Sequence, residues 1–546
     1  MAFRFAKTKF GDVHGEELTG KYEGIAIFRS VPYAAPPVGE LRFRDPVDPE
    51  PWSGSLDTTQ FASKPMQPTQ TGLSMEPWAS DFYYMGTPQM SEDCLYVSIT
   101  TGAKEGEKKP VFMWFHGGGL ASGYYSEIEF AAEELAKKGI VVVSVGQRLN
   151  VFGYMCLPQL MEEQGGTAGN YGLKDEVKAL DWVRENIAYF GGDPDNITVG
   201  GQSGGTAKST GLATSPYALG KVKRCINQSN LAWMRDYETM ESACESGRAY
   251  LENLGLDPDM TVEELRKIPA MKFYNFVKDP GFGMGVKGGL PGSMVCDGKY
   301  VKYVQAEKNM AEFAAEVDYL SGGNVGEGTV RGFGLGPVEP FKNADEFYAC
   351  MQEKLGDLYD DAAFRKMWPV TDENATYMSR VLASRAFGNG WGIMGGIITN
   401  RYFGAYRAKT APKARNWSYN FGRYLPCRPE EKGTFRDTDN LLAWHSSELW
   451  YTFHSMHEGM PACRPWEDVD FRLAEQMSSY WANFIATGDP NSGYAPCAYD
   501  LPTWPESREN WGYMTFTTEP VPSEGLDEID KLALEVIKRE GKYPEI

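Results

Sequence analysis

The chain has 546 residues, of which 42% are hydrophobic and 23% are charged, a composition typical of a globular protein with a large buried core. Its formal net charge of −20 argues against nucleic acid or an anionic membrane surface as a partner, because both are themselves negatively charged. No stretch reaches the roughly 18 uninterrupted apolar residues of a membrane span, so we expect no membrane partner.

The N-terminal segment and the cysteines indicate the compartment. Residues 1–20 lack the apolar run and the small-residue cleavage site of a secretory signal. Nine cysteines are spread along the chain without a CxxC pair, which is typical of reduced thiols. We therefore expect a cytoplasmic protein.

In the first half of the chain, three short apolar runs bounded by turn residues predict buried strands at 109–119, 139–149 and 196–205. Between the last two, the range 175–190 has apolar residues at helical spacing and predicts a helix. A strand, a helix and a strand in this order predict a βαβ unit and a largely parallel sheet.

The second half is less regular. Strands are predicted at 316–324 and 416–424, and the rest of the range from about 231 to 415 is expected to form helices and loops over the sheet. The range 526–540 predicts a final helix packed on the body. No linker or repeat divides the chain, so we expect one domain, 1–546.

The motif GxSxG occurs in "TVGGQSGGTA" and centres on Ser203. At a sharp strand-to-helix turn, the central serine is exposed above the sheet, and the residues two positions away on either side approach each other. Gly201 and Gly205 meet that requirement. An ordinary glycine turn is the alternative interpretation of this motif alone.

A nucleophilic serine needs hydrogen-bond donors for the oxyanion that forms on the substrate carbonyl. The stretch "FHGGGL", at 115–120, follows a predicted strand, and its glycines can turn backbone N–H groups toward a substrate. The N–H of Gly204, directly after Ser203, would complete such an oxyanion hole. A flexible turn is the alternative for this stretch when it is considered alone.

A general base is sought among only five histidines, His14, His116, His445, His454 and His457. On a hydrolase sheet the order is serine, acid, histidine, which excludes His14 and leaves His116 with the glycine motif. His454 and His457 form an HxxH pair, but no third metal ligand is indicated, and surface histidines are the preferred interpretation. His445 is therefore the predicted base.

The acid is expected between Ser203 and His445, a range with many carboxylates. Glu327 follows a predicted strand and has glycines on both sides. A carboxylate at the C-terminal end of a strand is well placed to orient an imidazole and to stabilise its cation. Glu327 is the predicted acid, while the other carboxylates stay open on these grounds.

Several collinear segments resemble the type-B carboxylesterase family. They include "SEDCLYVSI", "QRLNVFGYM", "GNYGLKDEVKALDWVRENIAYFGGDPDNITVGGQSGG" and "AWHSSELWYTF". The resemblance implies an α/β protein of the α/β-hydrolase fold, with a central, mostly parallel mixed sheet flanked by helices. It also implies a helical and loop cap over the active site, within about 231–415.

The resemblance also implies the site residues. It places the nucleophile on Ser203, the acid on Glu327 and the base on His445, with oxyanion donors on Gly118, Gly119 and Gly204, a serine supporting the acid on Ser229, and His116 in a supporting position. The implied activity is hydrolysis of small-molecule carboxylic esters through an acyl-enzyme, without a metal or an organic cofactor. Hydrolysis of amides, lactones or carbamates by the same triad is one alternative, and a non-catalytic binding protein is another.

Some positions depart from the family pattern. Gln202 and Gly204 replace the usual Glu and Ala of the GxSxG motif, and Gly204 is expected to loosen the turn. Cys94 is expected to face Met66 instead of a second cysteine. Lys208 stands where relatives have small residues, and we expect it to reach solvent.

Three stretches, at 281–289, 332–336 and 386–396, are rich in glycine, and the first two lack the context of a phosphate-binding loop. We expect the first two to be loops at the substrate entrance and the third to make core contacts or to shape the pocket. In some relatives a terminal helix mediates dimers, so a homo-oligomer is a further possibility.

Overall fold

The computed structural model describes residues 4–68, 81, 88–229, 236–274, 289–329, 341–382, 397–434, 436–456, 464–541 and 544–546. Its central feature is a sheet of 11 strands. From one edge to the other, these are β18 (Pro520–Ser523), β17 (Tyr513–Phe516), β16 (Asn416–Phe421), β15 (Asp318–Asn324), β12 (Arg224–Gln228), β11 (Gly192–Gln202), β9 (Lys109–Phe115), β10 (Val141–Val145), β8 (Tyr96–Thr101), β4 (Ala26–Pro32) and β3 (Glu16–Glu17). Neighbours from β17 to β10 are parallel, and the remaining pairs at both edges are antiparallel.

The five predicted strands all lie in this sheet, as β9, β10, β11, β15 and β16, and the predicted mixed, mostly parallel architecture is confirmed. The predicted helix between β10 and β11 is also present, as α5 (Tyr171–Asn186). However, β10 and β11 are not neighbours, because β9 lies between them. The connection through α5 therefore crosses over one strand.

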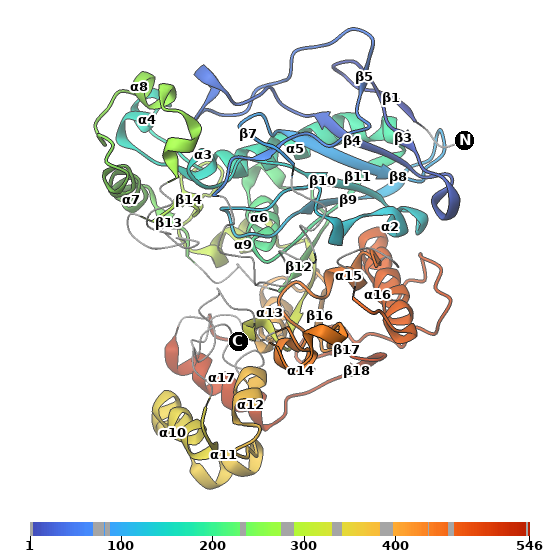
Figure 1. Ribbon diagram of the computed structural model, residues 1–546, viewed down its shortest axis with the longest axis vertical. Coiled ribbons are helices and arrows are strands. Elements are labelled where there is room, and N and C mark those ends of the chain that lie inside the picture. Colours follow the sequence, from blue (N-terminus) through green and yellow to red (C-terminus); the bar gives the residue numbers. More distant parts are fainter. Residues whose placement is uncertain are drawn as a thin grey trace.

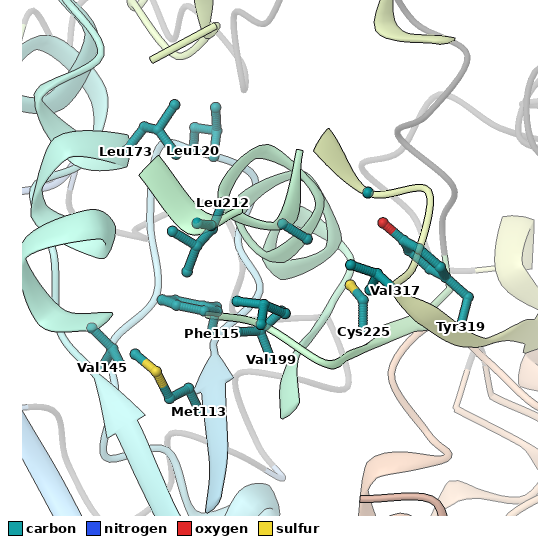
Figure 2. Close-up of a cluster of buried hydrophobic side chains, with 14 of the residues drawn as sticks. Met113, Phe115, Leu120, Val145, Leu173, Val199, Leu212, Cys225, Val317 and Tyr319 are labelled. Carbon is teal, nitrogen blue, oxygen red and sulfur yellow. The ribbon is translucent and has the colours of Figure 1, made fainter. Parts of the chain in front are cut away.

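The sheet is covered on both faces, which explains why its central strands have continuous apolar runs. Alternate residues of β9 pack in different cores: Val111, Met113 and Phe115 in one, Phe112 and Trp114 in the other. The first core includes residues of α5 and α6, and Figure 2 shows Leu212 of α6 close to Phe115. The second core includes residues of α16.

The α-helices of the described residues are α2 (Glu133–Lys137), α3 (Asn150–Tyr154), α4 (Pro158–Glu163), α5, α6 (Gly204–Ala213), α7 (Met240–Asn253), α8 (Val262–Lys267), α9 (Ala306–Phe313), α10 (Ala344–Leu355), α11 (Asp361–Met367), α12 (Ala375–Leu382), α13 (Ile398–Thr410), α14 (Thr438–Leu441), α15 (Leu449–Thr452), α16 (Asp468–Thr487) and α17 (Glu528–Glu540). Within these parts of the chain, none of the helices has both the length and the apolar character that crossing a bilayer requires.

Five of the described helices expected to cover the sheet lie in two groups, apart from α9 and α13 (Figure 1). Helices α7 and α8 lie beside α4, where Gln159 donates hydrogen bonds to the carbonyls of Pro258 and Met260. Helices α10, α11 and α12 lie at the other end of the molecule, near α17, where Arg539 donates to the Leu355 carbonyl. The predicted C-terminal helix thus packs on the body, as expected. The cap, the single domain and association through α17 stay predictions.

Candidate active site

Ser203 lies at the turn between β11 and α6, with φ 55° and ψ −119°. A positive φ is uncommon for a residue with a side chain and marks a strained backbone at this turn. A Cβ on Gly201 would lie 2.3 Å from the Gly205 main chain, and a Cβ on Gly205 would lie 2.0 Å from the Phe115 carbonyl oxygen. Both positions therefore require glycine, which is the close approach expected of a nucleophile turn.

Glu327 and His445 are brought together by two segments at the C-terminal edge of the sheet. The Nδ1 of His445 is hydrogen-bonded to Oε2 of Glu327, and the two residues are 4% and 5% exposed, respectively. The segments are joined by the Gly326 N–H, which donates to the Ala443 carbonyl at 2.9 Å. A Cβ on Gly326 would lie 2.7 Å from that oxygen, so the glycine before Glu327 allows the close contact.

Two further residues of this site were not predicted from the sequence. The N–H of Asn324 donates to Oε1 of Glu327 at 2.8 Å, and its amide Nδ2 donates to Oε2 of Glu448 at 2.5 Å. Asn324 lies three residues before Glu327, and Glu448 three residues after His445. Their closeness in sequence to Glu327 and His445 could have suggested them. Polar residues are so common, however, that a spacing of three residues does not distinguish these two from others.

Glu448 also accounts for Ser229. The Oγ of Ser229 donates to Oε1 of Glu448 at 2.9 Å. Ser229 therefore gives its one hydroxyl proton to Glu448, and its support of Glu327 stays a prediction. Among the residues that the structure describes, hydrogen bonds link Ser229 to Glu327 through Glu448 and Asn324.

Burial and neighbouring charges change the pKa values of Glu448 and His445. Burial raises the pKa of Glu448 to about 7, and the charge of Glu327 acts in the same direction. Burial lowers the pKa of His445, but the charge and hydrogen bond of Glu327, with a contribution from Glu448, raise it above its usual 6.5. The site thus stabilises a protonated imidazole through Glu327.

Gln202 lies next to the other side of the imidazole. Its Nε2 is 3.4 Å from Nε2 of His445, and its side chain is almost completely buried. Because Nδ1 of His445 donates to Glu327, the other ring nitrogen of a neutral imidazole is an acceptor, and the Gln202 amide donates toward it. A neutral amide thus takes the place of the carboxylate that the family pattern has at this position.

The glycine turn after β9 packs directly against the start of α6. Gly118 and Gly119 have φ 85° and 64°, a region that favours glycine. A Cβ on Gly204 would lie 2.1 Å from the Gly119 carbonyl oxygen. The expectation that Gly204 loosens the turn is therefore wrong, because the missing Cβ is what lets the Gly119 backbone approach α6 so closely.

Lys208 is fully buried, so the expectation that it reaches solvent is wrong. Almost every residue of α6 is buried, and the helix therefore has no solvent face for a lysine. Its Nζ donates to the main-chain carbonyl of His116 at 2.9 Å. His116 is itself fully buried, and burial together with the Lys208 charge holds the pKa of its imidazole well below the usual value.

The remaining residues singled out in the sequence are two histidines, Cys94 and the glycine-rich stretches. His454 lies 3.4 Å from Glu475, an ion-pair distance, whereas His457 lies outside the described residues. Cys94 is a free buried thiol and lines the same small cavity as Met66, in agreement with the expected pairing of positions. The glycine-rich ranges 281–288, 332–336 and 386–396 also lie outside the described residues.

The order of the strands and the strained serine between β11 and α6 define an α/β-hydrolase. Comparison with known proteins gives the family. The sequence model of the carboxylesterase family matches residues 3–532, so the chain belongs to that family and is a hydrolase of carboxylic esters.

The relatives agree in length as well as in class. The chain is 29% identical over 503 residues to para-nitrobenzyl esterase of Bacillus subtilis (strain 168), and this alignment covers 90% of this chain and 91% of that protein. It is 29% identical over 527 residues to fumonisin B1 esterase of Sphingopyxis macrogoltabida, which covers 95% and 87%, respectively. Its fold is similar to the crystal structure of a Geobacillus stearothermophilus carboxylesterase, with a TM-score of 0.69, 27% identity and coverage of 97% of this chain and 100% of that chain.

Proposed function

We propose that Ser203, His445 and Glu327 form the catalytic triad of this carboxylesterase. The observation that carries the proposal is the buried hydrogen bond between Glu327 and His445, at the edge of the sheet where the strained Ser203 turn lies. Glu327 orients the imidazole and stabilises its cation, while Ser203 is the nucleophile.

In this mechanism His445 removes the proton from Ser203 Oγ as that oxygen attacks the ester carbonyl carbon. The N–H groups of Gly118, Gly119 and Gly204 hold the resulting oxyanion. The tetrahedral intermediate collapses to the acyl-enzyme, and the alcohol leaves with the proton from His445. Water, activated by His445, then releases the acid. Each proton moves between groups of the chain, substrate and water, so the mechanism needs no metal or organic cofactor.

The proposal is tested with para-nitrophenyl acetate and butyrate on the wild-type protein and Ser203→Ala. We expect the variant to stay folded and to lose essentially all turnover, because the nucleophile is gone. A serine-directed organophosphonate should add once to the wild type, at Ser203, and not to the variant. Ser209→Ala, which changes a buried serine of the same helix, is the matched control and should keep its turnover. A folded Ser203→Ala protein with wild-type turnover would contradict the proposal.

We propose small-molecule esters as substrates and a cytoplasmic location. Para-nitrobenzyl esters are the first class to test, because a relative that aligns with 90% of the chain is named for them. Matched amide, lactone and carbamate analogues would separate an esterase from the other hydrolases that the same triad supports. All eight cysteines of the described residues are free thiols, which supports a compartment that keeps cysteines reduced.

A further inference from the structure

Lys208 is a buried lysine for which the proposed mechanism has no role. Its side chain is completely enclosed, in the helix that begins directly after Ser203. Burying an ammonium group is costly unless its donors are satisfied, and a well-packed apolar side chain is often the more stable choice. The hydrogen bonds of Lys208 must therefore offset the cost of its burial.

With the side-chain amide of Gln147 assigned in the orientation that gives both its oxygen and its nitrogen partners, two oxygen atoms accept from the Nζ of Lys208. One is the main-chain carbonyl of His116, at 2.9 Å, and the other is the side-chain oxygen of Gln147, at 2.7 Å. In this orientation the Gln147 amide nitrogen also donates to the Val145 carbonyl at 2.7 Å, so both ends of that amide have partners. The Nζ is also close to the His116 ring, at 3.4 Å from each ring nitrogen.

The bonded carbonyl belongs to the residue at which β9 gives way to the glycine turn. Phe115 ends β9, and Gly118 and Gly119 follow two and three residues after His116. Lys208 lies four residues after Gly204, and hence on the same side of α6. The helix therefore holds the turn at both ends: Gly204 contacts Gly119, and Lys208 is bonded to His116.

We propose that Lys208 is a positioning residue of the oxyanion hole: by holding the His116 carbonyl against α6, it sets the backbone that presents the N–H groups of Gly118 and Gly119. This inference rests on the proposed function, since it assigns Lys208 to the oxyanion donors named there. Lys208 acts through the main chain of His116 and takes no part in the proton transfers.

The hydrogen bonds do not depend on a full charge. Burial lowers the pKa of Lys208 to about 7, with the carboxyl groups of Glu176 and Glu127 acting in the opposite direction. Both an ammonium and a neutral amine have enough N–H groups to donate to the two oxygens. The positioning role is therefore expected on both sides of neutral pH.

The test compares Lys208→Met, Lys208→Gln and a matched control, Lys174→Met. Lys174 is 4% exposed and bonded to Asp45 at 2.6 Å, on α5, so the control also removes a buried lysine but leaves the glycine turn unchanged. Active sites are counted with an organophosphonate, and kcat is expressed per counted site. An alkyl trifluoromethyl ketone, which adds to the serine and places an oxyanion in the hole, supplies a second measurement. Urea denaturation reports stability separately.

For Lys208→Met we expect kcat per site to fall about 10- to 100-fold, because a displaced donor weakens only the transition state. KM should change by less than about threefold, and the Ki of the trifluoromethyl ketone should rise by the same factor as kcat/KM falls. Lys208→Gln, which retains a donor, should lose less. Lys174→Met should keep the wild-type kcat per site and Ki, whatever its stability.

A folded Lys208→Met protein with wild-type kcat per site and Ki would overturn the inference. Should that variant not fold, Lys208→Gln decides: its amide nitrogen lies one bond closer to the main chain than Nζ and should hold the His116 carbonyl less well, so an unchanged kcat and Ki in a folded Lys208→Gln protein would overturn the inference equally. Ser203→Ala is measured alongside. If Ser203→Ala is inactive while both Lys208 variants are unimpaired, only the role of Lys208 fails. If Ser203→Ala keeps its turnover, the proposed triad fails first.

Discussion

Gly204→Ala is a one-atom test of the contact between α6 and the glycine turn. The new Cβ would lie 2.1 Å from the Gly119 carbonyl oxygen, and real Cβ contacts below 3.0 Å essentially never occur. The Gly119 backbone must therefore move by about 1 Å, a displacement that can cost about 100-fold in rate when it affects a catalytic group. Loss of one oxyanion donor costs roughly 100- to 1,000-fold in kcat. Although the family pattern has Ala at this position, the glycine turn of this chain packs directly against Gly204, and we therefore expect kcat to fall about 100-fold, or about 2.7 kcal/mol in activation free energy.

The measurement is kcat and KM for para-nitrophenyl butyrate, per active site counted with an organophosphonate. Gly211→Ala is the control, because it makes the same change in the same helix. Its Cβ would lie 2.6 Å from the sulfur of Met294, a flexible side chain that can move aside. The Gly211→Ala control should keep the wild-type kcat. Its helix should not be destabilised, because alanine has a higher helix propensity than glycine. A Gly204→Ala protein with the kcat of the control would refute the argument from close packing.

Two further predictions concern pH and stability. Because the pKa of His445 is raised above 6.5, the neutral base is lost as the pH falls through that raised pKa; kcat/KM should fall about tenfold per pH unit on the acid side, and a profile flat down to about pH 5 would contradict a histidine base. Arg148 is hydrogen-bonded to both carboxylate oxygens of Asp175, at 2.6 and 2.8 Å, and both residues are buried. Asp175→Asn should therefore lower the free energy of unfolding by about 3–5 kcal/mol in urea denaturation. Asp181 lies on the same helix as Asp175, but its ion pair with Lys221 is partly exposed, so the matched change Asp181→Asn should cost no more than about 1 kcal/mol, and equal effects would contradict the difference in burial.

The sequence predicted the elements whose signal is local. The apolar run of β9 is continuous because both faces of that strand are covered, and the glycines around Ser203 follow from the close approach of two backbones. Strand β12 was not predicted, although it lies next to β11 in the sheet. Its polar residues Asn227 and Gln228 are buried and hydrogen-bonded, so the strand lacks an apolar pattern.

The errors at the site have a different cause. Lys208 was expected to reach solvent because a lysine in a helix usually does, but α6 is buried almost all round, and the helical period then carries no information about which side faces water. The contact of Asn324 with Glu448 joins residues 124 positions apart, and such a hydrogen bond has no local signature. Ser229 donates its hydrogen bond to the carboxyl group of Glu448, which was not predicted either.

Three hydrogen bonds connect the segment that carries Glu327 with the segment that leads to His445. Besides the bond from Gly326, Asn324 donates to the Trp444 carbonyl at 2.8 Å, and Thr329 donates to the Leu441 carbonyl at 2.6 Å. The positions of the predicted acid and base are therefore fixed relative to each other by the main chain of the segment before His445. All three acceptors are main-chain carbonyls and do not depend on the side chains at 441–444, so in a chimera with a related esterase the side chains to retain are the donors Asn324 and Thr329, together with Gly326.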